Sequence, residues 1–315
     1  MRKYSGILVL VVILVLFIVP ILIIQVTQPE GRRFRGVVLE DTQHREISFP
    51  NTAQQIELGG MLFAPSGEGP FPAVVVIHGS GNSLRNHRWY LTLTQFLQEN
   101  GVAVLLPDKR GSEKSQGDWR SADFEDLATD TLAAIQYLKE QDMVAISKIG
   151  VVGMSQGGWI APIVANQSPD VAFLVNFVGS AVTPQEQLLY EENHNLRQMG
   201  FLPGISNLVA LMSTAYLKNI GQKEFWDAID GFDPLPYWEQ LTVDSLTLYG
   251  REDTNVPSAD SAEKLRALKN PRIQVRIYDG SGHALADPVD LGDSIIRQEV
   301  LDDIRDFIGS VSDHR

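Results

Sequence analysis

The chain has 315 residues, of which 44% are hydrophobic and 21% are charged, so it can form one large α/β domain or two small ones. Its 39 acidic and 26 basic residues give a formal net charge of −13, which repels nucleic-acid phosphates and argues against a nucleic-acid partner. The absence of cysteine excludes disulfides, thiolate metal sites and a cysteine nucleophile.

The first feature along the chain is an apolar run at 7–24, with no charged residue between Lys3 and Glu30. At about 1.5 Å per helical residue, this run and its flanks can cross a bilayer core of roughly 30 Å. A cleaved signal peptide is the alternative, but its apolar region is usually about 7–15 residues long and ends at small residues, which are lacking here. We therefore expect 1–26 to be a single-pass membrane anchor and 27–43 a linker. The short, basic N-terminal tail favours an orientation with the rest of the chain on the extracytoplasmic side.

After the linker, runs typical of strands alternate with helical patterns. The runs at 44–50 and 56–65 flank a turn and predict an antiparallel pair. Further runs are rich in β-branched residues, as buried parallel strands are; they cover 73–79, 101–108, 148–153, 171–179, 244–250 and 273–280. The clearest helical pattern covers 123–141. This alternation predicts a mostly parallel sheet with helices on both faces.

One long segment interrupts the alternation. Between 183 and 240 the sequence has helical patterns and no strand pattern. We expect a helical insertion that divides the α/β core into a first part, 44–182, and a second part, 241–315.

The stretch "VVGMSQGGWI" at 151–160 places Ser155 between Gly153 and Gly157, where an apolar strand pattern changes to a helical one. A serine at such a corner is either a helix N-cap or a nucleophile. A nucleophile must sit on a sharp turn, and glycines on both sides let the strand and the helix approach without Cβ clashes. The pattern therefore favours a nucleophile.

A serine hydroxyl needs a base, and the base needs a carboxylate that orients it. Of the six histidines, His78 and His283 follow strands, and the carboxyl ends of parallel strands meet at one edge of a sheet. His283, in a glycine-rich loop after the last strand, is the better base. Glu252 and Asp253 follow the preceding strand and are the candidate carboxylates. Asp279 lies only four residues before His283, which leaves little room for the required hydrogen bond.

Negative charge that develops during attack needs hydrogen-bond donors. The backbone N–H of Gln156 at the helix start is one candidate, and the loop "HGSGNS" offers a second from Ser80 or Gly81. Gly79 and Gly81 permit a close approach of the backbone in this loop, which His78 begins. Arg110, in "DKRG", is expected at the same edge as a structural ion-pair partner rather than as an anchor for a substrate carboxylate.

Five motifs occur in the order "HGSG", "DKRGSEKSQGDW", "GMSQGG", "YGREDTNVP" and "GSGH". Together they resemble the α/β-hydrolases over roughly residues 45 to 310, close to bacterial esterases and to serine aminopeptidase-like (S33) and acyl-thioesterase-like members. The resemblance implies a catalytic triad and two backbone oxyanion donors, carried by Ser155, Asp253 and His283 and by Ser80 and Gln156. It also implies that 183–240 is a cap over the site.

The implied function is that of a serine hydrolase, which cleaves a carboxylic ester or thioester of a small acyl substrate through an acyl-enzyme. One alternative is an aminopeptidase-like peptidase, in which Glu186, Glu191 or Glu192 of the insertion would hold a substrate amine. Another is a non-catalytic, membrane-anchored binding domain on the same scaffold. No cofactor and no metal are expected, because neither H-E-x-x-H nor a glycine-rich phosphate loop occurs. The oligomeric state stays open.

The insertion is also expected to line the acyl pocket. Its apolar side chains would then face the edge of the sheet, among them Leu208, Leu211, Met212 and Trp226. Packing within the insertion alone is the competing expectation for the same residues.

Overall fold

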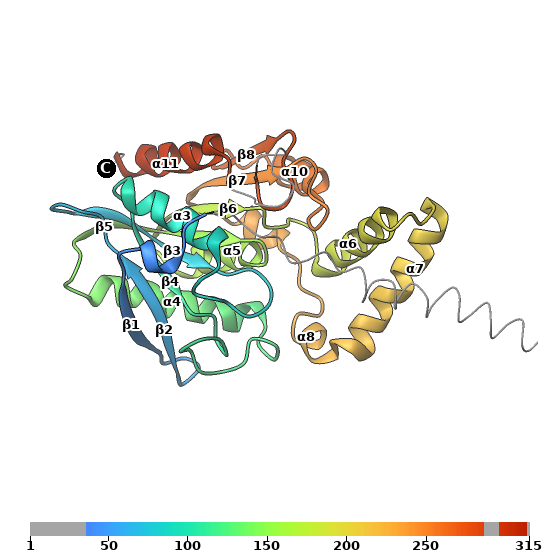
Figure 1. The fold of residues 1–315 in the computed structure, drawn as a ribbon, viewed down its shortest axis with the longest axis horizontal. Helices are drawn as coiled ribbons and strands as arrows, with labels where there is room; N and C mark the ends of the chain where they lie inside the picture. Colours follow the sequence, from blue (N-terminus) through green and yellow to red (C-terminus); the bar gives the residue numbers. More distant parts are fainter. Residues whose placement is uncertain (1–35, 287–295, 314–315) are drawn as a thin grey trace, which may run out of the picture.

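The structure is a computed structural model that describes residues 36–286 and 296–313. Its sheet has eight strands in the order β1-β2-β4-β3-β5-β6-β7-β8, antiparallel at β1–β2 and β2–β4 and parallel at the other pairs (Figure 1). The strands are β1 (Arg45–Asn51), β2 (Ile56–Phe63), β3 (Phe71–Ile77), β4 (Ala103–Pro107), β5 (Ile146–Met154), β6 (Val171–Phe177), β7 (Asp244–Gly250) and β8 (Ile273–Tyr278). The predicted strands and the mostly parallel sheet are confirmed.

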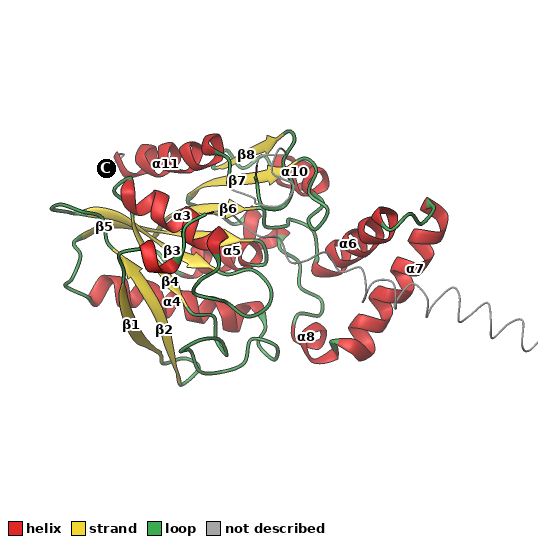
Figure 2. Cartoon of the chain, in the orientation of Figure 1, coloured by secondary structure: helices red, strands yellow, loops and turns green. Residues whose placement is uncertain are grey.

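Helices cover both faces of the sheet (Figure 2). They are α3 (Arg88–Glu99) and α11 (Gln298–Asp313) on one face, and α4 (Phe124–Glu140), α5 (Gly157–Gln167) and α10 (Ser258–Ala267) on the other. A short 3-10 helix, η2 (Leu39–Asp41), precedes β1. Successive side chains of β3 serve the two faces in turn: Val74 and Val76 pack with α3, whereas Ala73, Val75 and Ile77 pack with α4 and α5. A strand buried on both faces needs apolar residues throughout, which explains its continuous run.

The parallel strands deliver their carboxyl ends to one edge of the sheet. The segments that leave this edge begin at 78 after β3, at 108 after β4, at 155 after β5, at 251 after β7 and at 279 after β8. The residues expected to form the triad and the oxyanion loop all lie on these segments. The fold therefore gathers residues that are up to 205 positions apart, from 78 to 283, along a single edge.

The insertion between β6 and β7 is helical, as predicted. It contains α6 (Pro184–Gln198), α7 (Pro203–Tyr216), the π-helical turn η3 (Leu217–Gly221), α8 (Lys223–Ala228) and α9 (Leu235–Glu239). Helix α6 begins at a capping box, in which the Thr183 hydroxyl accepts the Glu186 amide while the Glu186 carboxylate accepts the Thr183 amide. Helices α6 and α7 pack against each other and project away from the sheet (Figure 1).

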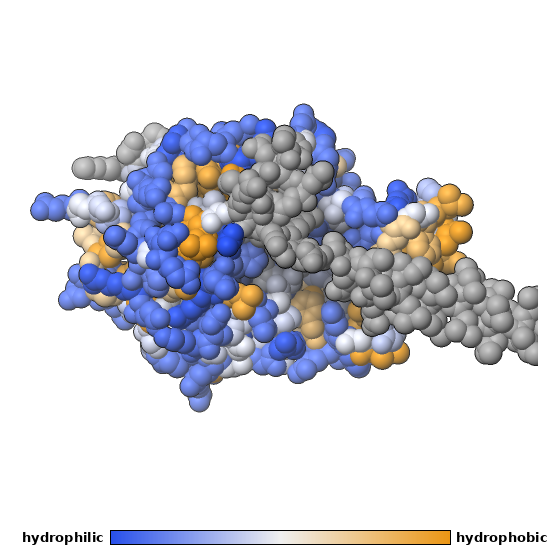
Figure 3. Space-filling model, viewed as in Figure 1, coloured by the Kyte–Doolittle hydropathy of each residue, from blue (hydrophilic) through white to orange (hydrophobic). Residues whose placement is uncertain are grey.

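The competing expectation, that the apolar residues of the insertion pack within it, is wrong for α7. Leu208, Leu211 and Met212 are 61%, 56% and 45% exposed, and the buried residues of α7 are Ser206 and Ala210. Apolar surface gathers at this outer end of the molecule (Figure 3). Trp226 on α8, by contrast, is 6% exposed and belongs to the core beside α4 and α5.

The predicted membrane anchor, 1–26, and most of the predicted linker lie outside the described residues. Within 36–286 and 296–313, the helices are all too short or too polar to span a bilayer.

Candidate active site

Ser155 stands on the turn that joins β5 to α5. Its φ angle is 53°, in the left-handed region that a residue with a Cβ seldom adopts, so the backbone is held in this conformation by its surroundings. The surroundings of the two flanking glycines leave no room for a side chain at either position. A Cβ at Gly153 would lie 2.3 Å from the Gly157 carbonyl oxygen, and one at Gly157 would lie 2.2 Å from the Ile77 carbonyl oxygen. The corner is thus a tight strand-to-helix turn that presents Ser155 at the sheet edge.

Three side chains from three separate segments meet at this corner. His283 Nε2 lies 3.0 Å from Ser155 Oγ, and His283 Nδ1 lies 2.8 Å from Asp253 Oδ2. Asp253 is 1% exposed, and its other oxygen, Oδ1, accepts the backbone N–H groups of Asn255 and Val256 at 2.8 and 2.9 Å. These bonds satisfy the buried carboxylate and fix its direction, so it can accept a hydrogen bond from the Nδ1–H group while Nε2 faces the serine.

The other carboxylates considered for this place lie elsewhere. Glu252 is exposed, and Asp279 forms an exposed ion pair with Arg251. Both residues lie on the turn after β7, where the Asn255 and Val256 N–H groups hold the Asp253 carboxylate inward and Glu252 stays exposed.

The two backbone amides nominated as oxyanion donors border the same corner. Among the described residues, neither the Ser80 amide nor the Gln156 amide is taken by a protein acceptor. The neighbouring Gly79 amide is occupied, because it donates to the Tyr90 hydroxyl at 2.8 Å. Gly81 has a φ of 85°, so the loop turns through a conformation that favours glycine. Ser80 and Gln156 therefore offer two uncommitted donors beside Ser155.

His78 supports this loop and does not face the serine. It is 7% exposed, and its Nε2–H donates to the Pro107 carbonyl at 2.6 Å. Burial disfavours the charged ring and lowers the pKa of His78 to about 4, so the ring is neutral near pH 7. Its bond ties the end of β3 to the end of β4.

Several residues near the site carry no sequence motif and were not predicted. The Trp89 indole N–H donates to the carbonyl of Ala284 at 3.1 Å, directly after the histidine, and its ring centroid lies 6.0 Å from that of His283. The Tyr190 hydroxyl on α6 donates to the Asp253 carbonyl at 2.7 Å. In the sequence, the apolar pattern of α3 indicates only that Trp89 and Tyr90 are buried, and it does not indicate that they lie near the site.

Glu191 follows Tyr190 on α6 and approaches the same segment. Its carboxylate accepts from the Asn255 side-chain amide at 2.9 Å. Burial raises the pKa of Glu191 and outweighs the opposing influence of His283. Glu191 was one of three acidic residues that the sequence offered, and it is the one that lies beside the Asp253 segment.

Arg110 has the structural role expected of it. Its guanidinium pairs with Asp130 at 2.7 Å and donates to the Asp126 carbonyl at 2.6 Å.

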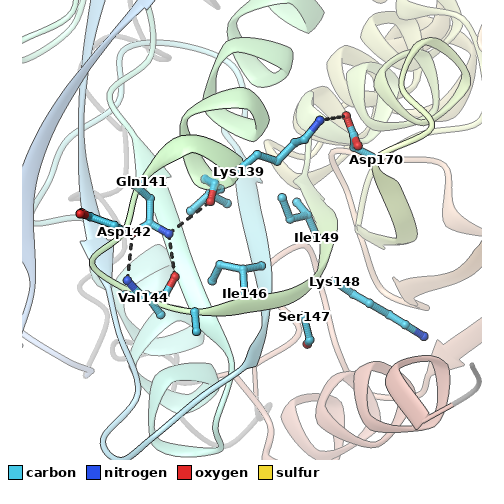
Figure 4. Close-up of a pocket in the computed structure, with 11 residues that line it drawn as sticks. Lys139, Gln141, Asp142, Val144, Ile146, Ser147, Lys148, Ile149 and Asp170 are labelled. Atoms are coloured by element: carbon cyan, nitrogen blue, oxygen red, sulfur yellow. Dashed lines mark hydrogen bonds and ion pairs between the residues drawn. The ribbon is translucent and has the colours of Figure 1, made fainter.

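A hollow of about 570 Å³ lies at the opposite edge of the sheet, at the amino ends of β5 and β6 (Figure 4). Its lining contains Ser147 and the Lys139–Asp170 ion pair but no histidine, so it offers a serine without a base.

Two family models match the chain. One, described as BAAT / Acyl-CoA thioester hydrolase C terminal, matches residues 132–312, and the Dienelactone hydrolase family model matches residues 58–197.

Curated relatives are similar over most of this chain. Esterase EstD of Thermotoga maritima is 25% identical over 243 residues, 72% of this chain and 58% of the relative. A peroxisomal succinyl-coenzyme A thioesterase of mouse is 25% identical over 249 residues, which are 72% of this chain and 52% of the relative. The human acylamino-acid-releasing enzyme is 25% identical over 268 residues, 77% of this chain and 34% of the relative. The chain thus spans little more than half of the first two relatives and a third of the last.

Solved structures share the fold. An esterase of Pyrococcus furiosus superposes with a TM-score of 0.63 at 17% identity, covering 89% of this chain and 98% of that one. An alpha/beta hydrolase from a Penicillium species gives 0.61 at 20% identity, covering 86% and 99%. At these identities the likeness concerns the fold, which is that of the α/β-hydrolases.

Proposed function

The chain belongs to the BAAT / acyl-CoA thioester hydrolase C-terminal family, and from this premise we propose that it is a serine hydrolase of carboxylic esters or thioesters. Ser155 is the nucleophile, His283 the base and Asp253 the residue that orients the base. The observation that carries the proposal is the pair of contacts at His283, 3.0 Å to Ser155 Oγ and 2.8 Å to Asp253 Oδ2.

The proposed reaction has two stages. Ser155 Oγ attacks the acyl carbonyl carbon while its proton passes to His283 Nε2, and the resulting oxyanion accepts from the Ser80 and Gln156 amides. Collapse breaks the bond to the leaving oxygen or sulfur, which takes the proton from His283 and leaves an acyl-enzyme. A water then attacks the acyl group, again giving its proton to His283, and the acid is released as Ser155 recovers its proton.

A peptidase is the second candidate, because a carboxylate lies in the right region. Glu191 faces the Asp253 segment from α6, where a carboxylate could receive a substrate ammonium group. The similarity to acylamino-acid-releasing enzymes agrees with this alternative. The Glu191 carboxylate already accepts from the Asn255 amide, whereas the contacts of His283 serve an ester or thioester without a further group, so the esterase stays first.

The proposal is tested by labelling and by a substrate panel. A fluorophosphonate probe should label the wild type and leave Ser155→Ala unlabelled, whereas Ser147→Ala, an exposed serine at the opposite edge, should label fully. Equal labelling of all three proteins would refute the nucleophile. Aliphatic p-nitrophenyl esters, acyl-CoA thioesters and aminoacyl p-nitroanilides then separate esterase, thioesterase and peptidase. A protein that neither labels nor turns over any of them would be the binding domain.

Membrane attachment is a separate proposal, supported by the apolar run at 7–24 alone. We expect full-length protein to stay with membranes during a carbonate wash. Release into the supernatant, or a mature protein that begins near Gln28, would instead favour the signal peptide.

A further inference from the structure

Three charged residues follow β4 in succession, and all three are buried. Asp108 pairs with Arg85 at 2.6 Å, and Arg110 pairs with Asp130 at 2.7 Å. Lys109 lies between them at 7% exposure. Across 36–286 and 296–313 it forms no ion pair with a carboxylate, so it is the exception in this triplet.

Lys109 instead contacts the two segments that border Ser155. Its ammonium donates to the Gly79 carbonyl at 2.8 Å and to Gln156 Oε1 at 2.7 Å. The Trp119 ring lies beside it, with its centroid 4.8 Å from Nζ. The Lys109 backbone N–H also donates to Ser83 Oγ at 3.0 Å, which ties it to the loop after β3 a second time.

A buried ammonium without a carboxylate is costly. Burial disfavours the charged form, outweighs the opposing attraction of the Asp130 carboxylate and lowers the pKa of Lys109 to about 7. The two hydrogen bonds of the ammonium offset part of this cost, and both acceptors lie beside Ser155, which suggests a role in the site.

The two acceptors of Lys109 belong to the two amide donors of the site. The Gly79 carbonyl is part of the same planar peptide group as the Ser80 N–H, so a cation held at one end sets the direction of the other. Gln156 carries the second donor on its own backbone. We propose that Lys109 is a positioning residue, whose ammonium clamps both oxyanion donors in their working orientation. This inference rests on the proposed hydrolase function.

The clamp acts in two ways. It restrains the rotation of the Gly79–Ser80 peptide plane, which keeps the Ser80 N–H aimed at the oxyanion. A cation on the carbonyl oxygen also polarises the peptide, so that its N–H becomes a stronger donor, as in chained hydrogen bonds. Both effects matter most when the carbonyl oxygen becomes an oxyanion, and they matter little for the bound substrate.

The matched test compares Lys109→Met with Lys114→Met. Lys114 lies in the same segment but is 60% exposed, and its ion pair with Glu46 is at the surface. Removing one oxyanion donor costs about 10²–10³ in kcat, so loosening two donors without removing either should cost about 10–10². We expect this loss in kcat for Lys109→Met with little change in KM, and wild-type values for Lys114→Met.

A second readout is the affinity for a trifluoromethyl ketone, which forms a tetrahedral adduct with the nucleophilic serine. Its Ki should rise for Lys109→Met by the same factor by which kcat falls. A merely structural role would lower the fraction of folded protein and leave the Ki of the folded fraction unchanged. Folded Lys109→Met with wild-type kcat and wild-type Ki would overturn the inference.

The pH profile of the wild type needs no variant, so it remains decisive if Lys109→Met does not fold. Because His283 must be neutral to act as the base, kcat first rises with pH, whereas loss of the Lys109 ammonium, whose pKa is about 7, weakens the polarisation of the Gly79–Ser80 peptide and lowers kcat. The clamp therefore predicts that kcat falls again on the alkaline side, and a wild-type kcat that rises to a plateau and keeps it to about pH 9 would contradict the clamp. Fluorophosphonate labelling of the wild type distinguishes the two proposals. If the wild type is not labelled, the proposed hydrolase function is wrong; if it is labelled, the kinetic tests concern the role of Lys109 alone.

Discussion

The corner at Ser155 and the helices between β6 and β7 border the same edge of the sheet, but the corner is tightly packed and α7 is not. At the corner, a Cβ on Gly157 would meet a backbone oxygen at 2.2 Å, and His283 contacts both Ser155 and Asp253. On α7, a Cβ on Gly204 would meet nothing within 4 Å, and five large apolar side chains are exposed. A segment can therefore lie close to the site without having its side chains fixed by packing there.

The largest expected effect lies at the corner. Asp253→Asn keeps the size of the side chain, but its amide can donate to Nδ1 instead of accepting from the Nδ1–H group, so the wrong imidazole tautomer forms. Turnover should fall on the order of 10⁴-fold. Glu252→Gln, at the exposed neighbour, should cost little. Steady-state kcat on a p-nitrophenyl ester measures both, and the reverse ranking in two folded variants would move the orienting acid to Glu252.

The next prediction compares the effect on stability of two substitutions within the insertion. Trp226 packs in the core although it lies on α8, so Trp226→Ala should lower the free energy of unfolding by about 3–5 kcal/mol. Leu208→Ala, on the exposed side of α7, should change it by less than about 0.5 kcal/mol. Urea denaturation of both variants measures the difference. Similar losses would mean that α7 is packed in solution.

The smallest effect uses one substitution in both regions. Gly157→Ala forces a Cβ against the Ile77 carbonyl, which cannot rotate away, and should cost about 1–3 kcal/mol. Gly204→Ala lies in an open helical position and should stabilise the fold by about 0.5 kcal/mol, because alanine loses less backbone entropy. Thermal unfolding should therefore shift in opposite directions. A shift of the same sign would end the contrast between the two regions.

The same contrast explains what could be predicted. The positions of Ser155, Asp253 and His283 follow from strand ends, because parallel strands finish at one edge and a short turn leaves a side chain few directions. The apolar pattern of α7 runs around most of the helix, so periodicity could not say which side is buried. Pocket lining and packing within the insertion were therefore both open for Leu208 and Leu211, which are exposed.

Lys109 was missed for a different reason. In "DKRG" the sequence shows three charges after a buried strand, and Arg110 drew attention as the ion-pair partner, a role that the Asp130 contact confirms. The burial of Lys109 depends on Gly79 and Gln156, which lie 30 and 47 positions away. A local sequence pattern cannot show contacts over such distances. The only indication in the sequence was that three charged residues follow one buried strand in succession.

Tyr190 and Glu191 are consecutive residues of α6, and each ties this helix to the segment that carries Asp253. A swing of α6 away from the sheet edge has to break both ties, one of which runs through Asn255, whose backbone N–H also holds Asp253 Oδ1. The position of α6 and the orientation of the Asp253 carboxylate are therefore coupled through Asn255, so a change in the insertion reaches the residue that orients His283.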